Sequence, residues 1–357
     1  MSTLKVDTLQ HRDGTEFIFS ERNKLINGDF SVAQRGTSLT STDSANNDAK
    51  YILDMWQLFS DGNDVVDVTQ ETTTVPTNQL YAIALDVETA NKKFGIAQKI
   101  EQKNCVDLIG NEVTLSFKAK VSSTTNLDNV KCAIIAWDGT ADTLTDDMIS
   151  AWGAEGTNPT LATNYTYENT PANLNLTTSY ATYTTTATID TSGAKNVVVF
   201  IWSDVTTTSA GEFLYITDVQ LEKSPSNSTF ERKSFAQQLF DCQRYYQRYD
   251  NTTSAVDYTA TGYVGMAFYY NTGDAFLFFS RRGTATMRTT PSNETSSADV
   301  FNVIQGGNSR NTTNIPSDYN NPNINILRVQ TSGSATDESV ARVLTNSNEF
   351  FAFSAEL

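Results

Sequence analysis

The sequence contains a single histidine, His11, among 357 residues. Serine and cysteine nucleophiles usually depend on a histidine base, and most zinc sites include histidine, so the sequence disfavours both kinds of chemistry. The sequence also lacks a glycine-rich phosphate loop and a dinucleotide-binding fingerprint. We therefore expect no catalytic residue, no cofactor and no metal site, and we predict that the protein is not an enzyme.

Cysteines and long apolar runs are also scarce. The three cysteines, Cys105, Cys132 and Cys242, have no metal-ligand spacing and are expected to be buried free thiols. The longest strongly apolar run, Val197–Trp202, is far too short to cross a bilayer. The first residues lack the apolar core of a signal peptide. These features predict no membrane insertion and synthesis in a cytosol-like compartment.

Basic residues are outnumbered, with 25 Lys and Arg against 41 Asp and Glu, for a net charge of −16. Such a surface repels nucleic acid, and no basic patch stands out, so nucleic acid is not an expected partner. The many acids leave open a two-carboxylate glycosidase. Calcium ligation by Asp61 and Asp64, or by Asp142, Asp146 and Asp147, also stays open, although Asx turns are the more ordinary interpretation.

Charged residues are few, and Thr, Ser, Asn and aromatic residues are abundant. This composition favours β-strands joined by turns. Val113–Val121 alternates apolar and polar residues, which predicts one buried and one wet face. Ile134–Trp137 and Val197–Trp202 are predicted strands buried on both faces, and Phe213–Leu221 is another strand. We predict a jelly-roll β-sandwich over residues 25–232.

Strand patterns resume after Asp250 and predict a small β-sandwich-like domain over residues 251–357. Its expected elements are a hairpin and two further strands: Tyr263–Tyr270, Ala275–Phe279, Asn325–Val329 and Phe350–Phe353. Residues 283–323 are rich in Asn, Ser and Thr and are predicted to be loop. The fold class is therefore mainly β, with two β domains.

The segment between these domains, residues 233–250, differs from its surroundings. From Ser234 to Asp250 it has no Gly, Pro or Thr, and Ser234 and Gln237 fit a capping box, so we predict a connecting helix. Its apolar residues recur every three or four positions and form a seam: Phe235, Leu239, Cys242, Tyr246 and Tyr249.

Residues 1–24 form an arm that is too short to bury a core of its own. Such an arm needs a partner surface, on another subunit or on a larger assembly. The four tryptophans offer a different kind of contact, because an exposed indole stacks on sugar rings. Trp137 and Trp202 lie in apolar runs and are expected in the core, whereas Trp152 is the candidate for a glycan contact.

Several blocks of the sequence resemble a family of bacteriophage tail fibres and minor virion structural proteins. They are MSTLKVDTLQHRDGTEF, NKLINGDFSVAQRGTS, YILDMWQLF, GIAQKIE, VTLSFKAKV, LYITDVQLEKSPSNSTFERKSFAQQLFDCQRYYQR, MRTTP and FFAFSAEL. The LYITDV block, with its Phe-Glu-Arg exit and Cys-Gln-Arg-Tyr-Tyr end, is the most specific. The resemblance implies a carbohydrate-binding-module-like jelly roll, a virion location on tail or capsid, and assembly in the host cytoplasm.

The resemblance further implies that residues 1–24 anchor the chain on other virion proteins, through Leu4, Val6, Leu9, Phe17 and Phe19. It implies a homotrimer whose interface includes the helix seam: Phe235, Leu239, Cys242 and Tyr246. The alternative is that the helix packs on its own jelly roll. A host surface glycan or protein is the expected receptor, and the C-terminal domain is the expected tip. A capsid-vertex fibre or decoration protein and a glycan depolymerase are the alternative functions.

Overall fold

The structure is a computed structural model that describes residues 21–41, 45–250, 263–269, 274–279, 285–297, 299–305, 308–316, 322, 326–332, 340–345 and 349–357. The predicted anchoring residues Leu4, Val6, Leu9, Phe17 and Phe19 lie outside the described residues. Within the described ranges the protein is mainly β, as the sequence predicted, with only two helices. None of the helices in these ranges is long and apolar enough to cross a membrane.

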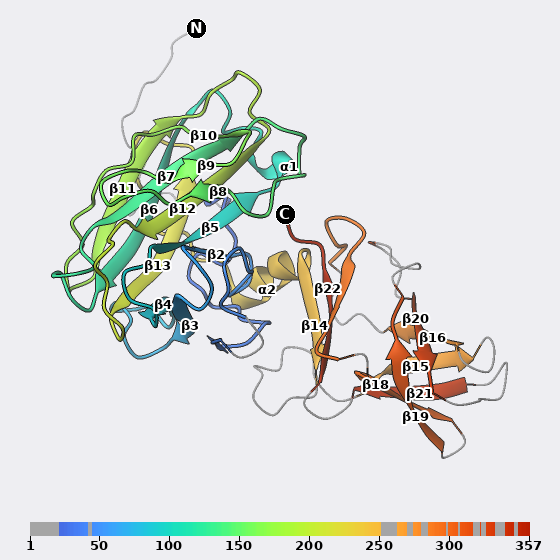
Figure 1. The fold of residues 1–357 in the computed structure, drawn as a ribbon. Coiled ribbons are helices and arrows are strands. Elements are labelled where there is room, and N and C mark those ends of the chain that lie inside the picture. Colours follow the sequence, from blue (N-terminus) through green and yellow to red (C-terminus); the bar gives the residue numbers. More distant parts are fainter. Residues whose placement is uncertain are drawn as a thin grey trace, which may run out of the picture.

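The N-terminal part is a sandwich of two antiparallel sheets (Figure 1). The six-stranded sheet has the order β1 (Ser38–Leu39), β3 (Val66–Glu71), β4 (Ala82–Val87), β13 (Phe213–Glu222), β6 (Glu112–Val121) and β11 (Ala181–Thr188). The five-stranded sheet has the order β10 (Tyr165–Tyr167), β7 (Val130–Trp137), β12 (Asn196–Ser203), β5 (Phe94–Ile100) and β2 (Gln57–Ser60). Two small elements accompany them, the β8 (Ile149–Ala151) and β9 (Thr160–Leu161) pair and helix α1 (Gln102–Cys105). This arrangement confirms the predicted jelly-roll sandwich and its strands.

The five-stranded sheet is buried on both faces, as its continuous apolar runs predicted. Alternate residues of β12 point into the core between the sheets: Val197, Val199 and Ile201. The residues between them point to a second cluster on the outer side: Val198, Phe200 and Trp202. Side chains between Leu144 and Tyr165, together with helix α2 (Phe235–Gln243), cover that outer side. The chain thus covers this sheet with its own segments.

The six-stranded sheet buries one face and keeps the other accessible. In β6 the apolar residues pack in the core between the sheets: Val113, Leu115, Phe117, Ala119 and Val121. On the opposite face Lys118 and Lys120 are half-buried, whereas Thr114 and Ser116 are buried. The Thr114 hydroxyl donates to the carbonyl oxygen of Ser224 at 2.8 Å, so the segment after β13 covers part of this face. The predicted wet face is therefore only partly exposed.

Helix α2 begins where the sequence predicted and ends earlier. The Ser234 hydroxyl accepts a hydrogen bond from the Gln237 amide at 3.3 Å, but the Gln237 side chain donates to Asp241 at 2.6 Å. Only the serine half of the capping box therefore forms. The prediction of helix up to Asp250 is wrong, because the helix ends at Gln243 and Tyr246–Asp250 form strand β14. β14 pairs with the distant strand β22 (Phe350–Ser354), a partner that local sequence cannot reveal.

The predicted helix seam is mostly enclosed by the same chain. Cys242 is fully buried against the outer side of the five-stranded sheet, and Leu239 is half-buried against that cluster. Tyr246 lies in β14 and is also buried. In this fold Cys242 and Tyr246 are therefore packed inside their own chain, which corrects their assignment to a subunit interface. Phe235 remains 47% exposed.

The C-terminal part contains a three-stranded sheet and a closed barrel. The sheet has the order β14, β22 and β17 (Ser292–Thr295). The barrel has the order β15 (Tyr263–Tyr269), β16 (Asp274–Phe279), β20 (Ile326–Thr331), β19 (Asn308–Asn314), β18 (Phe301–Gln305) and β21 (Val340–Thr345). The β15–β16 hairpin is confirmed. The prediction of loop over residues 283–323 is wrong, since β17, β18 and β19 lie there and gain their hydrogen bonds from distant strands.

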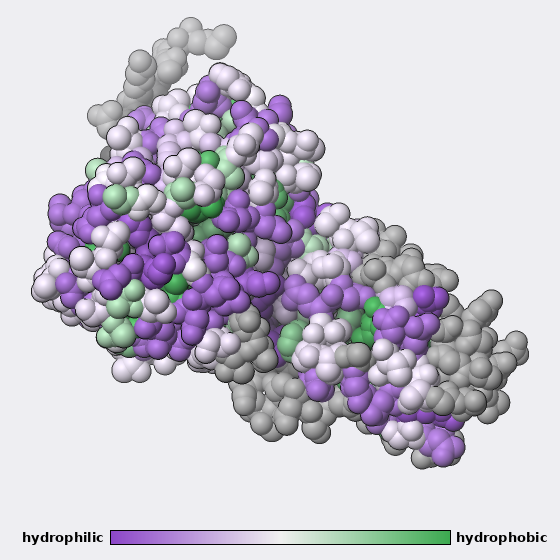
Figure 2. All heavy atoms as spheres, viewed as in Figure 1, coloured by the Kyte–Doolittle hydropathy of each residue, from purple (hydrophilic) through white to green (hydrophobic). Residues whose placement is uncertain are grey.

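Helix α2, β14 and β22 lie between the sandwich and the barrel (Figure 1). Arg35 of the sandwich forms a buried, two-pronged ion pair with Glu356, which follows β22. The guanidinium carbon of Arg35 also lies 3.5 Å from the centre of the Tyr246 ring. These contacts hold the end of the chain against the jelly roll. The face of the jelly roll visible in Figure 2 is mostly hydrophilic, with apolar side chains confined to small areas.

Candidate functional site

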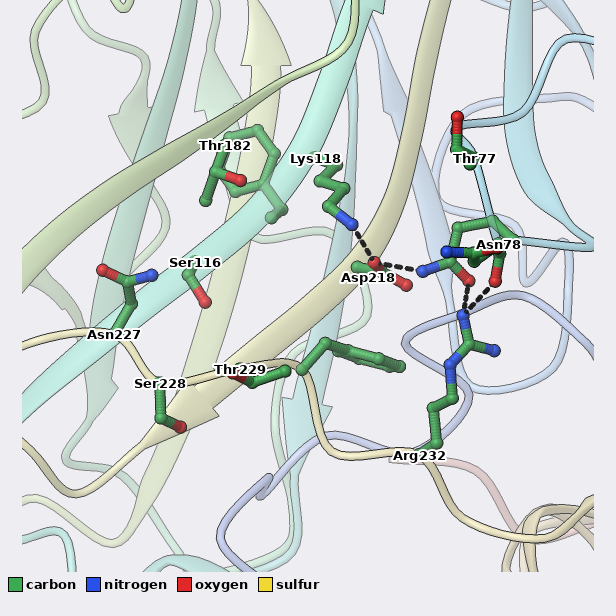
Figure 3. Close-up of a pocket in the computed structure, with 13 residues that line it drawn as sticks. Thr77, Asn78, Ser116, Lys118, Thr182, Asp218, Asn227, Ser228, Thr229 and Arg232 are labelled. Atoms are coloured by element: carbon green, nitrogen blue, oxygen red, sulfur yellow. Dashed lines mark hydrogen bonds and ion pairs between the residues drawn. The ribbon is translucent and has the colours of Figure 1, made fainter. Parts of the chain in front are cut away.

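A polar pocket of about 530 Å³ lies on the accessible face of the six-stranded sheet (Figure 3). Strands β6, β11 and β13, the turn before β4 and the segment after β13 contribute its lining: Thr77, Asn78, Gln79, Ser116, Phe117, Lys118, Thr182, Asp218, Asn227, Ser228, Thr229, Phe230 and Arg232. Ligand pockets of small molecules typically have volumes of about 300–1,000 Å³. The pocket is therefore large enough for a small ligand or one unit of a polymer.

A β-bulge places Asp218 in the pocket. The pairing of β13 with β6 shifts between Thr217 and Gln220, and Asp218 has a φ of 53°, which is rare for a residue other than glycine. After the bulge, Val219 and Leu221 point into the core again. A strained backbone conformation of this kind persists only where the surrounding structure holds it in place. Residues with such a conformation often occur at functional sites.

Asp218 is the centre of a hydrogen-bonded network that joins four segments. Its Oδ2 lies 2.9 Å from the Lys118 ammonium and accepts a hydrogen bond from the Gln79 side-chain amide. Gln79 in turn accepts a hydrogen bond from Arg232, which also donates to the carbonyl oxygen of Asn78 at 2.7 Å. In Figure 3 Lys118 and Asp218 point toward each other, while Arg232 reaches toward Asn78 from another side of the pocket.

The Asp218 carboxylate is buried, since only 2% of its side chain is exposed. Its second oxygen, Oδ1, has no hydrogen-bond partner among the residues that the structure describes. Buried carboxylate oxygens are rarely left without a partner. The unpaired Oδ1 of Asp218 is therefore an unusual feature, and it points to a role beyond that of an ordinary surface ion pair.

A tight turn forms one wall of the pocket. The Gln79 amide donates to the carbonyl oxygen of Pro76 at 3.0 Å, and Asn78 has a φ of 67°. Asparagine tolerates this left-handed conformation at the third position of a turn better than most residues. The turn thereby directs both Asn78 and Gln79 toward Arg232.

The segment after β13 forms the opposite wall and is held by buried polar groups. The Glu222 carboxylate accepts hydrogen bonds from the amide and the hydroxyl of Ser228, both at 2.7 Å. Gln220 donates to Glu222 at 2.9 Å and accepts from the Glu231 amide at 2.8 Å. These bonds fix the wall before any ligand arrives, which lowers the entropic cost of binding.

The pocket combines hydroxyl and amide groups with two aromatic residues, Phe117 and Phe230. Its hydroxyl and amide residues match the alternating donors and acceptors of a sugar, and Phe230 offers an apolar surface. Among the described residues no group of three or more His, Cys, Asp or Glu side chains is placed to hold a metal ion. Asp142, one of the candidate calcium ligands, accepts hydrogen bonds from the Gln102 amide and the Asn196 side chain. The arrangement is suited to binding a polyhydroxylated ligand.

The predicted glycan contact, Trp152, does not line this pocket. It is half-buried beside β8 and packs against the outer side of the five-stranded sheet, with its ring centre 6.1 Å from that of Phe200. Trp137 and Trp202 are 4% and 0% exposed, which confirms their place in the core.

Sequence reasoning missed the pocket residues Lys118, Asp218 and Arg232. One signal was available for the bulge. Core-facing apolar residues in β13 are two positions apart at Leu214 and Ile216, but the next one, Val219, follows after three. A break in alternation of this kind indicates a bulge, yet it does not reveal which segments meet there.

No family model matches the chain, and no curated protein sequence matches it either. Among solved structures, the enzymatically active domain of tailspike protein 4 from bacteriophage CBA120 is similar, with 16% identity and a TM-score of 0.34 over 58% of this chain. The present chain spans only 22% of that tailspike chain. A putative sugar-binding protein from Bacteroides thetaiotaomicron has 16% identity and a TM-score of 0.36, over 57% of this chain and all (100%) of its own.

A family 4 carbohydrate-binding module has 14% identity and a TM-score of 0.29, over 56% of this chain and 98% of its own. At these TM-scores the likenesses carry no argument about function. The strand order and antiparallel pairing of the two sheets establish that the N-terminal part of this chain is a jelly-roll β-sandwich.

Proposed function

We propose that this chain is a non-catalytic, glycan-binding component of a bacteriophage virion, in the form of a homotrimeric tail fibre. The observation that carries the binding function is the polar pocket on the accessible face of the six-stranded sheet. Its walls are held by Glu222, Gln220 and the turn at Asn78, so the site is formed before binding. The virion location rests on the sequence blocks that resemble phage fibres, with residues 1–24 as the attachment arm.

The choice of the jelly roll as the binding domain differs from the expectation that the C-terminal domain is the tip that binds the receptor. The jelly roll carries a pocket with several convergent polar groups and an aromatic side chain, which is the usual character of a ligand site. The outer side of its other sheet is covered by residues of the same chain.

The composition of the pocket supports binding without catalysis. Glycoside hydrolysis generally requires two carboxyl groups on either side of the scissile bond. Asp218 is the single carboxylate in the lining, and it is buried in an ion pair with Lys118. A carboxylate in that position is poorly placed to donate a proton to a leaving group.

The proposed trimer must use surfaces other than Cys242 and Tyr246. Helix α2 keeps Phe235 and Phe240 exposed, at 47% and 43%, and these side chains are the proposed contacts with the symmetry mates. Phe235→Glu is a sharper test than a change at the half-buried Leu239, because a charge at Leu239 would also disturb its own fold.

Light scattering of the purified full chain measures the assembly directly. We expect a trimeric mass for the wild type and a monomeric mass for Phe235→Glu. Val106→Glu is the matched control, because Val106 is also apolar and is 60% exposed, but lies at the end of α1. A monomeric wild type, or a Phe235→Glu variant that stays trimeric, would overturn this mode of assembly.

Binding and location require separate experiments. Saturation-transfer NMR of the full chain with host surface polysaccharide tests binding, and the release of reducing ends tests the depolymerase alternative. Cryo-electron microscopy of the phage distinguishes a tail fibre from a capsid-vertex or decoration protein. Removal of residues 1–20, which keeps the buried Asn23 and its hydrogen bonds to β13, should leave a folded protein that no longer joins particles.

A further inference from the structure

The pocket on the six-stranded sheet has a local charge opposite to that of the whole protein. Its lining includes two cationic side chains, Lys118 and Arg232, and one carboxylate, Asp218. The chain as a whole has a net charge of −16. A cationic pocket on an acidic protein attracts an anionic group specifically, because the surrounding surface repels it elsewhere.

Arg232 forms no ion pair with a carboxylate within the described part of the chain. Its Nη2 donates to two neutral oxygens, the carbonyl of Asn78 and the side-chain amide of Gln79. No described carboxylate forms an ion pair with it, and its Nη1 and Nε have no acceptor among the described residues. The hydrogen bonds of Nη2 thus hold the guanidinium in position, while the N–H groups of Nη1 and Nε remain available to an anion.

Lys118 adds a second cation next to the network. Its ammonium contacts Asp218 at 2.9 Å, but 35% of its side chain is exposed whereas that of Asp218 is only 2% exposed. The carboxylate is therefore more deeply buried than the Lys118 side chain, whose ammonium has further N–H donors beyond the one that Asp218 accepts. Gln79 connects the two cationic sites, since it donates to Asp218 and accepts from Arg232.

The opposite end of the pocket is neutral and rich in hydroxyl and amide groups. Figure 3 shows Ser116, Thr182, Asn227 and Ser228 together on the side away from Arg232. A ligand that satisfies both ends carries an anionic group and several hydroxyls. Phe230 in the lining provides an apolar surface for the ring of such a unit.

We propose that this pocket binds an anionic sugar unit of an acidic surface polysaccharide, with the anion at the end that carries Arg232 and Lys118 and the hydroxyls at the neutral end. This inference rests on the proposed glycan-binding function. The shared chemistry is an anion on a sugar, which a uronic acid carboxylate or a sugar phosphate supplies. The planar guanidinium group of Arg232 can donate hydrogen bonds to either group.

The test uses the full chain in calorimetry and saturation-transfer NMR with three probes: an oligogalacturonate, glucose 1-phosphate and neutral maltotriose. We expect at least one anionic probe to bind, maltotriose to bind more weakly or not at all, and higher salt to weaken binding. Arg232→Gln should weaken anion binding by about tenfold or more, since hydrogen bonds to charged groups are the stronger ones.

Lys120→Gln is the matched control. Lys120 lies two residues further along β6 on the same face, but its ammonium lies 5.5 Å from the centre of the Tyr215 ring and 5.9 Å from that of Tyr180. It does not line the pocket. Its loss should therefore leave affinity unchanged at constant salt, within about twofold. Circular dichroism and thermal unfolding of both variants show whether the fold is retained.

The outcomes separate the inference from the function on which it rests. Equal binding of maltotriose and the anionic probes, or an Arg232→Gln variant with unchanged affinity, overturns the anionic ligand but leaves glycan binding intact. Equal losses in Arg232→Gln and Lys120→Gln show a general charge effect and also overturn the site. If neither these probes nor host polysaccharide binds, the proposed glycan-binding function fails as well. Uronate binding without phosphate binding, or the reverse, identifies the anion.

Discussion

Replacing Asp204 with Asn should destabilise the jelly roll strongly, because Asp204 holds two buried ammonium groups. Its side chain is 0% exposed, and its oxygens lie 2.5 Å from the Lys93 nitrogen and 2.7 Å from the Lys131 nitrogen. The Lys93 and Lys131 side chains are only 2% and 7% exposed. Asp204 also accepts a hydrogen bond from the Gly156 amide at 2.9 Å, which ties the segment after β8 to the sheet.

The expected loss follows from the charges left behind. Removing one partner of a buried ion pair typically costs about 3–5 kcal/mol, and Asn keeps one accepting oxygen, so we expect the lower end, about 3 kcal/mol. For a domain of about 200 residues this corresponds to a fall in Tm of about 6–12 °C. Differential scanning calorimetry and urea unfolding at pH 7 measure both quantities.

Asp61→Asn provides the control. The Asp61 carboxylate pairs with Lys92, the neighbour of Lys93, at 3.5 Å, but these side chains are 48% and 39% exposed. An exposed pair of this kind is worth no more than about 1 kcal/mol. If Asp204→Asn and Asp61→Asn lose the same stability, the reasoning about burial is refuted.

The same cluster predicts a pH dependence. Burial raises the pKa of Asp204, but hydrogen bonds from Lys131, Lys93 and Gly156 outweigh burial and bring its pKa below the usual value. The folded protein therefore binds this proton less readily than the unfolded chain does. The stabilisation is complete above the unfolded pKa of about 4 and is lost as the pH falls through the folded value. The gap in unfolding free energy between wild type and Asp204→Asn should narrow from pH 7 to pH 2.5, and parallel curves would contradict the assignment.

Three further predictions concern other parts of the chain. Burial raises the pKa of Cys105 and Cys132 to about 12, so thiol reagent at pH 8 should leave all three cysteines unmodified until the protein is unfolded, and fast labelling of the native protein would contradict their burial. Gly95→Ala should cost about 1–3 kcal/mol or more in urea unfolding, because the new Cβ would lie 2.4 Å from the Ile201 carbonyl oxygen; wild-type stability would show that the sheet adjusts freely. Arg35→Ala leaves Glu356 buried without its cation, so amide hydrogen exchange over residues 350–357 should become faster, whereas unchanged exchange would mean that β22 alone holds this segment.

Local patterns were sufficient to predict four strands of the jelly roll, namely β6, β7, β12 and β13. The continuous apolar run Val197–Trp202 matched the burial that the structure shows. Alternation in Val113–Val121 correctly predicted the core-facing residues, but Thr114 and Ser116 on the other face are buried as well. These predictions succeed because side chains two residues apart share a face of a strand, whatever the strand pairs with. The N-cap at Ser234 succeeded for the same local reason.

Failures occurred where distant partners decide the conformation. Tyr246–Asp250 suited a helix by composition, but β22 supplies a row of hydrogen-bond partners that makes them a strand. Strand β19 looks like loop because Asn, Ser and Thr dominate it, and barrel pairing overrides that weak propensity. Strand β18 contains Phe301, Val303 and Ile304, a short apolar pattern that the loop prediction overlooked.

The sequence by itself therefore determined the class of fold, four strands of the jelly roll and the start of the helix, because these depend on spacing within one segment. Only the tertiary structure decided the pocket. Gln79, Lys118, Asp218 and Arg232 come from four separate segments, and they meet because β13 pairs with β6 across a bulge and the flanking turns pack beside it. The tertiary structure also decided that residues 144–165 and α2 cover the five-stranded sheet, which leaves the six-stranded sheet to carry the site. Contacts between segments that are distant in the sequence depend on how the whole chain packs. They therefore cannot be predicted from the pattern of residues within one segment.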